Sequence, residues 1–130
     1  MARRGQQFFR NAVLTNFDFQ CCVTGMNIAS LLNASHIVPW RVDVRQRLNP
    51  ANGLCLNAML DRAFDRGLVG FDRTGALLVS RYIARQANPA TQRYFYALAG
   101  QRILPAQKMS IDTSLLDWHR HEIFEQHLSD

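Results

Sequence analysis

Three residues between positions 34 and 68 combine a potential general base with a potential metal site. His36 lies at the end of an apolar segment, and Asp61 and Asp65 lie four residues apart in a segment with helical periodicity. Residues four apart share one helix face, so both carboxylates can reach one divalent cation such as Mg²⁺ or Mn²⁺. A neutral imidazole can remove the proton of an attacking water. These residue types suit metal-dependent hydrolysis of a phosphodiester.

Each of these residues also has a simpler structural explanation. A histidine at a strand end is more often a hydrogen-bonded structural residue than a base. Asn52 fits a turn, although its amide can also orient an imidazole or a loop. Asp61 and Asp65 are each followed by an arginine, which is typical of an exposed, ion-paired helix face. The order and spacing of the residues therefore carry the functional interpretation.

The elements that must position these residues follow from apolar periodicity and from the places of Gly and Pro. Helices are expected over residues 6–17, 58–66, 89–99 and 113–128. A short strand is expected over residues 21–24, entering a turn at Gly25. Further strands are expected over residues 31–39, 53–57, 68–72 and 76–80, of which the last two form a hairpin. Residues 41–52 should form an exposed loop. The prediction is an α+β fold with a central strand–loop–strand–helix unit.

Local signals give the limits and buried faces of the predicted helices. Asn57 is placed to cap the start of the helix over residues 58–66, and Gly67 is placed to end it. Apolar spacing predicts the buried sides of the first and last helices. These sides consist of Phe9, Val13, Leu14 and Phe17, and of Leu115, Trp118, Ile123 and Phe124.

Composition and charge restrict the class of protein. With 130 residues, of which 48% are hydrophobic and 19% charged, residues 1–130 suit a single globular domain. No apolar run approaches the ~20 residues that span a bilayer, and no signal segment is visible, so we expect a cytoplasmic protein without a membrane partner. A net charge of +5 favours a polyanionic partner. Lys108 is the single lysine, however, and a genomic preference for arginine codons explains the basic residues equally well.

The cysteines Cys21, Cys22 and Cys55 do not form a metal or disulfide pattern. Their odd number and the lack of a signal segment argue against a disulfide framework, and no C-x-x-C pair is present for a structural zinc site. All three lie in apolar segments. We expect them to be small buried residues.

Several sequence strings together resemble one family. The chain contains RRGQQFFR, CVTG, ASHIVPW, RLNPANGL and FDRGL, and the string LLDWHRHEIF lies near its end. Together they resemble the HNH (ββα-metal) endonucleases, in particular a bacterial branch found in restriction and defence proteins. The resemblance covers nearly the whole chain. It implies a ββα-metal core with added N- and C-terminal helices and a β-hairpin, in which two strands and a helix hold a divalent metal and the helix enters the minor groove of DNA.

The resemblance assigns roles to individual residues. His36 matches the general base, and Asn52 matches the asparagine that holds the loop in register. Asp61 falls where the generic motif has its final His, and Asp65 matches a further metal-ligand position. Ser35 stands where many relatives have a metal-binding Asp or His.

Two positions depart from the family pattern. The hydroxyl of Ser35 is a weak neutral ligand, and Leu60 stands where relatives of this branch often have His. Because leucine can neither bind a metal nor transfer a proton, we expect a weakened site. The sequence therefore predicts a metal-dependent DNA endonuclease, and the alternative is a catalytically degraded DNA-binding or interaction module of the same fold. Mg²⁺ or Mn²⁺ is the expected metal, ahead of Ni²⁺ or Zn²⁺.

Arginines near this segment are the expected contacts to DNA phosphates. These are Arg41, Arg45, Arg62 and Arg66, for which a solvated surface role is an equal alternative. Arg47 is expected to hold the loop through backbone carbonyls. Two questions about partners stay open: whether the chain forms a homodimer, and whether it is the C-terminal domain of a longer protein with an N-terminal recognition domain.

Two aromatic features have competing explanations. Trp40 can stack on a base, but packing beneath the loop is the favoured prediction, because an aromatic ring buries a large apolar area there. His119, His121 and His127 lie close together near the C-terminus. Their spacing does not place all three on one helix face, so an exposed polar side is favoured over a metal site.

Overall fold

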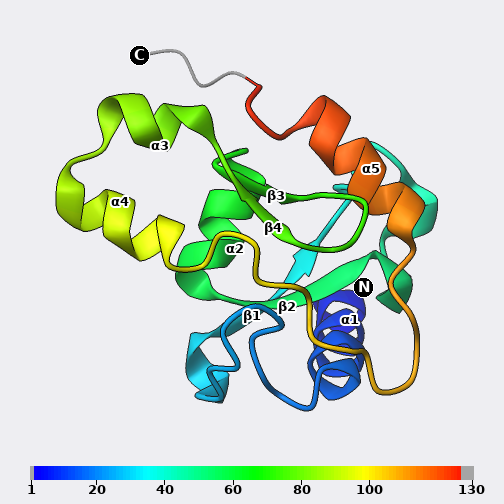
Figure 1. The fold of residues 1–130 in the computed structure, drawn as a ribbon. Helices are drawn as coiled ribbons and strands as arrows, with labels where there is room; N and C mark the ends of the chain where they lie inside the picture. The colour runs from blue at the N-terminus through cyan, green and yellow to red at the C-terminus, as the bar shows by residue number, and fades with distance from the viewer. Residues whose placement is uncertain (1, 127–130) are drawn as a thin grey trace.

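The computed structural model describes residues 2–126, which form α-helices around two small β-sheets (Figure 1). The α-helices are α1 (Ala2–Asn16), α2 (Ala58–Asp65), α3 (Arg81–Gln86), α4 (Pro89–Tyr96) and α5 (Thr113–Glu122). The strands are β1 (Leu32–His36), β2 (Gly53–Asn57), β3 (Val69–Phe71) and β4 (Leu77–Val79). Short 3₁₀ helices are η1 (Ala29–Leu31), η2 (Val44–Gln46) and η3 (Pro50–Asn52). Over residues 2–126, no helix is long and apolar enough to cross a membrane.

The predicted strand–loop–strand–helix unit is present. β1 and β2 pair antiparallel, with Leu32 opposite Asn57 and His36 opposite Gly53. The Asn57 side chain accepts a hydrogen bond of 2.9 Å from the Leu60 N–H, so β2 passes directly into α2 through an asparagine cap, as predicted. Gly67 follows α2 with a φ of +76°, a conformation that favours glycine and ends the helix.

Helix α1 covers one face of the β1–β2 hairpin. Phe9 and Val13 are buried, as their helical spacing predicts, and both lie against Gly53. A Cβ atom added to Gly53 would lie 2.2 Å from Val13 Cγ2 and 2.9 Å from Phe9 Cζ. Only glycine therefore permits this close approach of α1 to the strand that pairs with His36.

The second hairpin and α5 lie on the other side of α2. β3 and β4 pair antiparallel, with Val69 opposite Val79, and confirm the predicted hairpin. Helix α5 packs against β3, where Arg120 Nη1 donates a hydrogen bond of 2.9 Å to the Phe71 carbonyl. Helices α3 and α4 pack on each other beyond β4 (Figure 1).

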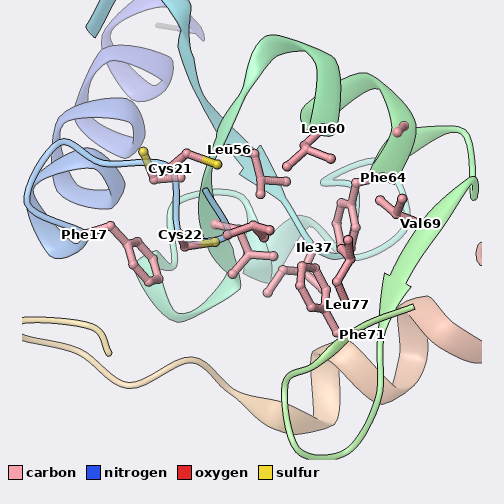
Figure 2. Close-up of a cluster of buried hydrophobic side chains, with 14 of the residues drawn as sticks. Phe17, Cys21, Cys22, Ile37, Leu56, Leu60, Phe64, Val69, Phe71 and Leu77 are labelled. Atoms are coloured by element: carbon pink, nitrogen blue, oxygen red, sulfur yellow. The ribbon is translucent and has the colours of Figure 1, made fainter. Parts of the chain in front are cut away.

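A cluster of buried side chains joins these elements (Figure 2). The cysteines Cys21, Cys22 and Cys55 are buried and free within it, as expected. Burial raises the pKa of Cys55 to about 12, so this thiol stays protonated. Other members come from β2, β3, β4 and α2, and from the residue that follows β1: Ile37, Leu56, Leu60, Phe64, Val69, Phe71 and Leu77.

Some predicted elements were wrong. Residues 21–24 form no strand: the Cys22 N–H donates to the Cys55 carbonyl, but the chain turns back at once, and the Cys21 N–H donates to the Met26 carbonyl. The apolar pattern there reflects burial. The predicted turn at Gly25 is present, with a φ of +77°. Helix α3, capped by Ser80, was not predicted. The last helix ends at Glu122, and residues 127–128 of the predicted helix lie outside the described residues. On its buried side, Leu116 is buried, whereas Trp118 is only half-buried.

Candidate active site

A hollow with a volume of about 520 Å³ lies between β1, the segment after it and α2. We call it the β1–α2 hollow. Its lining includes most of the site residues that the sequence singled out: Ser35, His36, Arg41, Asp61, Arg62, Asp65 and Arg66. The exceptions are Asn52, which is buried beneath the loop, and Arg45, which does not line the hollow.

Two contacts fix the ring of His36. Its Nε2 lies 2.8 Å from the carbonyl oxygen of Arg47. Its imidazole stacks on the phenyl ring of Phe9, with the ring centroids 3.8 Å apart and the planes 2° from parallel. Gly53, opposite His36 in the sheet, leaves the space for Phe9. Because a carbonyl oxygen only accepts, the neutral ring carries its proton on Nε2, and Nδ1 is left as the basic nitrogen.

Hydrogen bonds from Asn52 stabilise the loop that follows His36. Its Oδ1 accepts a hydrogen bond of 2.8 Å from the Val38 N–H, and its Nδ2 donates to the carbonyls of Val38 and Gln46, at 2.9 and 3.1 Å. Its backbone carbonyl accepts from the Ile37 N–H at 2.9 Å. The side chain is fully buried, so these bonds are not in competition with water. Asn52 therefore ties both ends of residues 38–46 to the start of β2.

The two carboxylates of α2 face β1. Asn33 Nδ2 donates a hydrogen bond of 2.9 Å to Asp61 Oδ2. Asn33 and Ser35 are two residues apart in a strand and so share the face toward α2. Desolvation of its carboxyl group, and next the negative charge of Asp61, raise the pKa of Asp65 to about 6, while Arg62, Arg41 and Arg66 act in the opposite direction. A cation between the carboxylates would remove this repulsion.

The residues of the hollow fit a hard divalent cation. The Oγ of Ser35 is buried on the strand face that turns toward Asp61, and it has no hydrogen-bond partner among the described residues. Mg²⁺ is commonly bound by one or two carboxylates, with waters and substrate phosphates completing its shell. Over residues 2–126, no group of three or more His, Cys, Asp or Glu side chains could hold a metal, so the hollow does not fit a closed structural zinc site.

The predicted arginines divide into two groups. Arg41, Arg62 and Arg66 line the hollow. Arg45 instead pairs with Asp43 through two hydrogen bonds of 3.1 and 3.2 Å. Its side chain is 85% exposed, so this pair anchors the loop surface only weakly. The structure thus does not bring Arg45 to the site.

The predictions for Trp40 and Arg47 were wrong. Trp40 is 53% exposed and does not pack beneath the loop. The guanidinium carbon of Arg47 lies over the Trp40 ring, 5.6 Å from its centroid, and the backbone carbonyl of Arg47 bonds to His36.

The histidines of α5 also differ from the prediction. His119 is buried, stacks on Phe64 with ring centroids 3.7 Å apart, and bonds to the Phe64 carbonyl through Nε2 at 2.9 Å. Burial lowers the pKa of His119 to about 4. His121 is exposed, as expected, and its Nδ1 lies 2.8 Å from the Asp117 carbonyl. His127 lies outside the described residues.

Leu60 does not belong to the hollow. It is fully buried, and Figure 2 shows its side chain beside Leu56 and Phe64 in the core. Asp61, the next residue, lines the hollow. Packing in the core therefore explains a leucine at position 60. Because this side chain does not face the hollow, the leucine does not deprive the hollow of a functional group.

Sequence reasoning missed two residues that orient the site, Phe9 and Asn33. Phe9 was assigned only to the core, since nothing local connects it to His36, 27 positions away in the chain. Asn33 lies two residues before Ser35, and strand periodicity alone would place it on the same face. That periodicity was a usable signal.

Comparison with known proteins agrees with this fold. Residues 21–72, which include β1, β2, α2 and β3, match the family model described as HNH endonuclease. Among solved structures, a modification dependent TagI restriction endonuclease has a similar fold, with a TM-score of 0.58 and 19% identity, over 88% of this chain and 37% of that chain. This chain thus spans a little over a third of that neighbour. No curated protein matches the chain. The fold is an α+β HNH fold with added helices and a second hairpin.

Proposed function

We propose that this domain is a metal-dependent DNA endonuclease that hydrolyses phosphodiester bonds with His36 as general base. One observation carries the proposal: a histidine with a fixed ring, two facing carboxylates and three arginines line the same hollow. The match to the HNH endonuclease model over residues 21–72 supports the reaction class.

His36 would activate the attacking water. Its Nε2–H is directed to the Arg47 carbonyl, so Nδ1 would accept the proton as the water oxygen forms its bond to phosphorus. The stack on Phe9 and the bond to Arg47 hold the imidazole in place before substrate binds, so the ring needs no reorganisation during the reaction. The bond between phosphorus and the 3′ oxygen then breaks.

Asp61, Asp65 and Ser35 would hold the divalent cation, for which Mg²⁺ or Mn²⁺ best matches an all-oxygen set. When bound, such a cation stabilises the negative charge on the departing oxygen. Arg41, Arg62 and Arg66 would bind the flanking phosphates. The structural neighbour is a restriction endonuclease, which supports a role in restriction or defence. An N-terminal recognition domain and a homodimer stay predictions.

Plasmid cleavage with Mg²⁺, Mn²⁺, Ni²⁺ or EDTA tests the proposal. Wild-type protein should cut with a metal and stop with EDTA, and His36→Ala should lose at least about 100-fold of the rate, the usual contribution of a general base. His121→Ala is the matched control, because His121 is exposed and does not line the hollow. Equal cutting by His36→Ala would overturn the assignment.

The alternative function predicts a different result in the same assay. A folded protein that shifts DNA in a gel but cuts with none of the metals would be a DNA-binding module. The burial of Leu60 removes one of the two reasons for expecting that outcome, since this residue does not face the hollow.

A further inference from the structure

Trp40 lies at the boundary between two hollows that meet at His36. One is the β1–α2 hollow. The other, of about 300 Å³, we call the α1–loop hollow, and it is lined by Gly5, Gln6, Phe9, His36, Trp40, Arg47 and Leu48. Trp40 and His36 line both. The exposed indole is therefore adjacent to the proposed base, and the proposed role of the β1–α2 hollow leaves it unused.

The exposure of Trp40 does not come from a loose loop. Asn52 bonds to Val38 on one side of it and to Gln46 on the other, from a fully buried position. The Val42 N–H also bonds to the Pro39 carbonyl at 2.9 Å, which closes a turn around the indole. A fixed backbone thus keeps a large apolar ring exposed to water. This exposure is unfavourable in free energy, and a ligand that covered the ring would remove the penalty.

The chemistry around Trp40 matches a nucleobase. The guanidinium carbon of Arg47 lies over the indole, 5.6 Å from the ring centroid, so an aromatic plane and a cation lie together. Gln6 and Arg47 bring polar groups to the α1–loop hollow, whose other lining residues are largely apolar or aromatic. Arg41 and Arg66 line the β1–α2 hollow, which Trp40 also lines, and there they suit a phosphate. A flat aromatic ligand with a polar edge and an attached phosphate combines these features.

We propose that Trp40, with Arg47, binds one unpaired nucleobase next to the phosphate that occupies the β1–α2 hollow. The inference rests on the proposed nuclease function and names its substrate class. A base inside a duplex is already stacked on both faces, so a site built on an exposed indole selects single-stranded or locally unpaired DNA. Base stacking is tolerant of sequence, so we expect little preference among the four bases.

Fluorescence of Trp40 provides a direct test in EDTA, where no cleavage interferes. The chain has two tryptophans, so Trp118→Phe leaves Trp40 as the single reporter. Short oligothymidylate should quench its emission, whereas an abasic strand with the same phosphates should not. If Trp118→Phe fails to fold, the difference in emission between wild type and Trp40→Phe gives the same signal.

Affinity measurements complete the test. Trp40→Ala should weaken binding of the single strand by about 5- to 100-fold, as stacking of one base predicts, and Trp40→Phe should retain most of it. Val44→Ala is the matched control, because Val44 is still more exposed on the same loop, at 67% against 53%. Quenching by the abasic strand, an unchanged affinity of Trp40→Ala, or equal weakening for single strand and duplex would each overturn the proposal.

The outcomes separate this inference from the nuclease proposal. If Trp40→Ala and wild type bind single strands equally while cleavage still depends on His36, the base site is wrong and the nuclease assignment stands. If oligothymidylate quenches Trp40 but no metal supports cleavage, the base site stands and the nuclease assignment is wrong.

Discussion

The imidazole of His36 lies flat against the phenyl ring of Phe9, 3.8 Å between centroids, although the two residues belong to different elements. The contact exists because Gly53, paired with His36 across the sheet, has no side chain in the way of α1. The orientation of the proposed base is therefore set by tertiary packing between α1 and the hairpin.

Gly53→Ala should test this arrangement. The new methyl group would lie 2.2 Å from Val13 Cγ2 and 2.9 Å from Phe9 Cζ, so α1 must shift. We expect a loss of about 1–3 kcal/mol in the free energy of unfolding, as for overpacked cores, and a fall in cleavage rate beyond any loss of folded protein. Urea unfolding and cleavage per folded molecule measure the two effects.

Gly5→Ala is the matched control for Gly53→Ala. Gly5 lies inside α1, and its added Cβ would meet the end of the exposed Leu48 side chain at 3.3 Å, which can move aside. Because alanine favours a helix over glycine, stability should stay equal or rise by up to about 1 kcal/mol. Equal effects of the two substitutions would show that the tight contact at Gly53 has no special role.

Asn33→Ala should weaken the proposed metal site without removing a proposed ligand. The Asn33 amide donates to Asp61 Oδ2 and so orients that carboxylate. Groups that orient metal ligands typically contribute 10- to 100-fold in affinity, so we expect Mn²⁺ binding to weaken by about 10-fold in a calorimetric titration. Asn11→Ala, an exposed asparagine on α1, is the control. An unchanged Mn²⁺ affinity for Asn33→Ala would exclude this role.

Asn52→Ala should destabilise the loop that carries Trp40. The substitution leaves the Val38 N–H and the carbonyls of Val38 and Gln46 without their partner in a buried place. A loss of at least about 2 kcal/mol in the free energy of unfolding is expected, with faster proteolysis within residues 39–49. Asn49→Ala, which removes bonds only at a partly exposed turn, should cost less.

The sequence allowed prediction of the features that depend on neighbouring residues. The capped start of α2, its glycine end and the shared face of Asp61 and Asp65 all follow from spacing within a few positions. The strands β1 and β2 followed from two apolar segments. Local pattern and tertiary structure agree in this unit.

Features that depend on distant contacts could not be predicted. The apolar residues that begin at Cys21 suggest a strand, but they lie in turns. They are buried because these turns pack against β2, where the Cys22 N–H bonds to the Cys55 carbonyl. Trp40 was expected to pack, because burial of an indole is usually favourable, whereas the backbone fastened by Asn52 holds it in solvent. His119 was expected on a polar face, and its burial depends on Phe64, 55 positions away.

Leu60→His should reduce stability without a gain in cleavage. Although the family resemblance predicts His at this position, Leu60 is fully buried in the core, and an imidazole there would lack a polar partner. We expect a loss of about 2–4 kcal/mol in the free energy of unfolding. Met59→His, one residue earlier at 56% exposure, should leave stability nearly unchanged. A large gain in plasmid cleavage by Leu60→His would show instead that leucine impairs the site.

His119 should make the protein less stable in acid. Burial lowers its pKa in the folded state to about 4, against 6.5 when unfolded, so below pH 6.5 the unfolded chain binds a proton that the folded chain does not. Its contribution is fully present above pH 6.5 and is lost as the pH falls toward 4, by about 3 kcal/mol at 1.36 kcal/mol per pH unit. Urea unfolding at several pH values should show this loss of stability in wild type and a smaller loss in His119→Gln. His121→Gln is the control and should behave as wild type, because His121 is exposed. Identical acid profiles for all three proteins would mean that His119 titrates normally and that its stack on Phe64 opens at low cost.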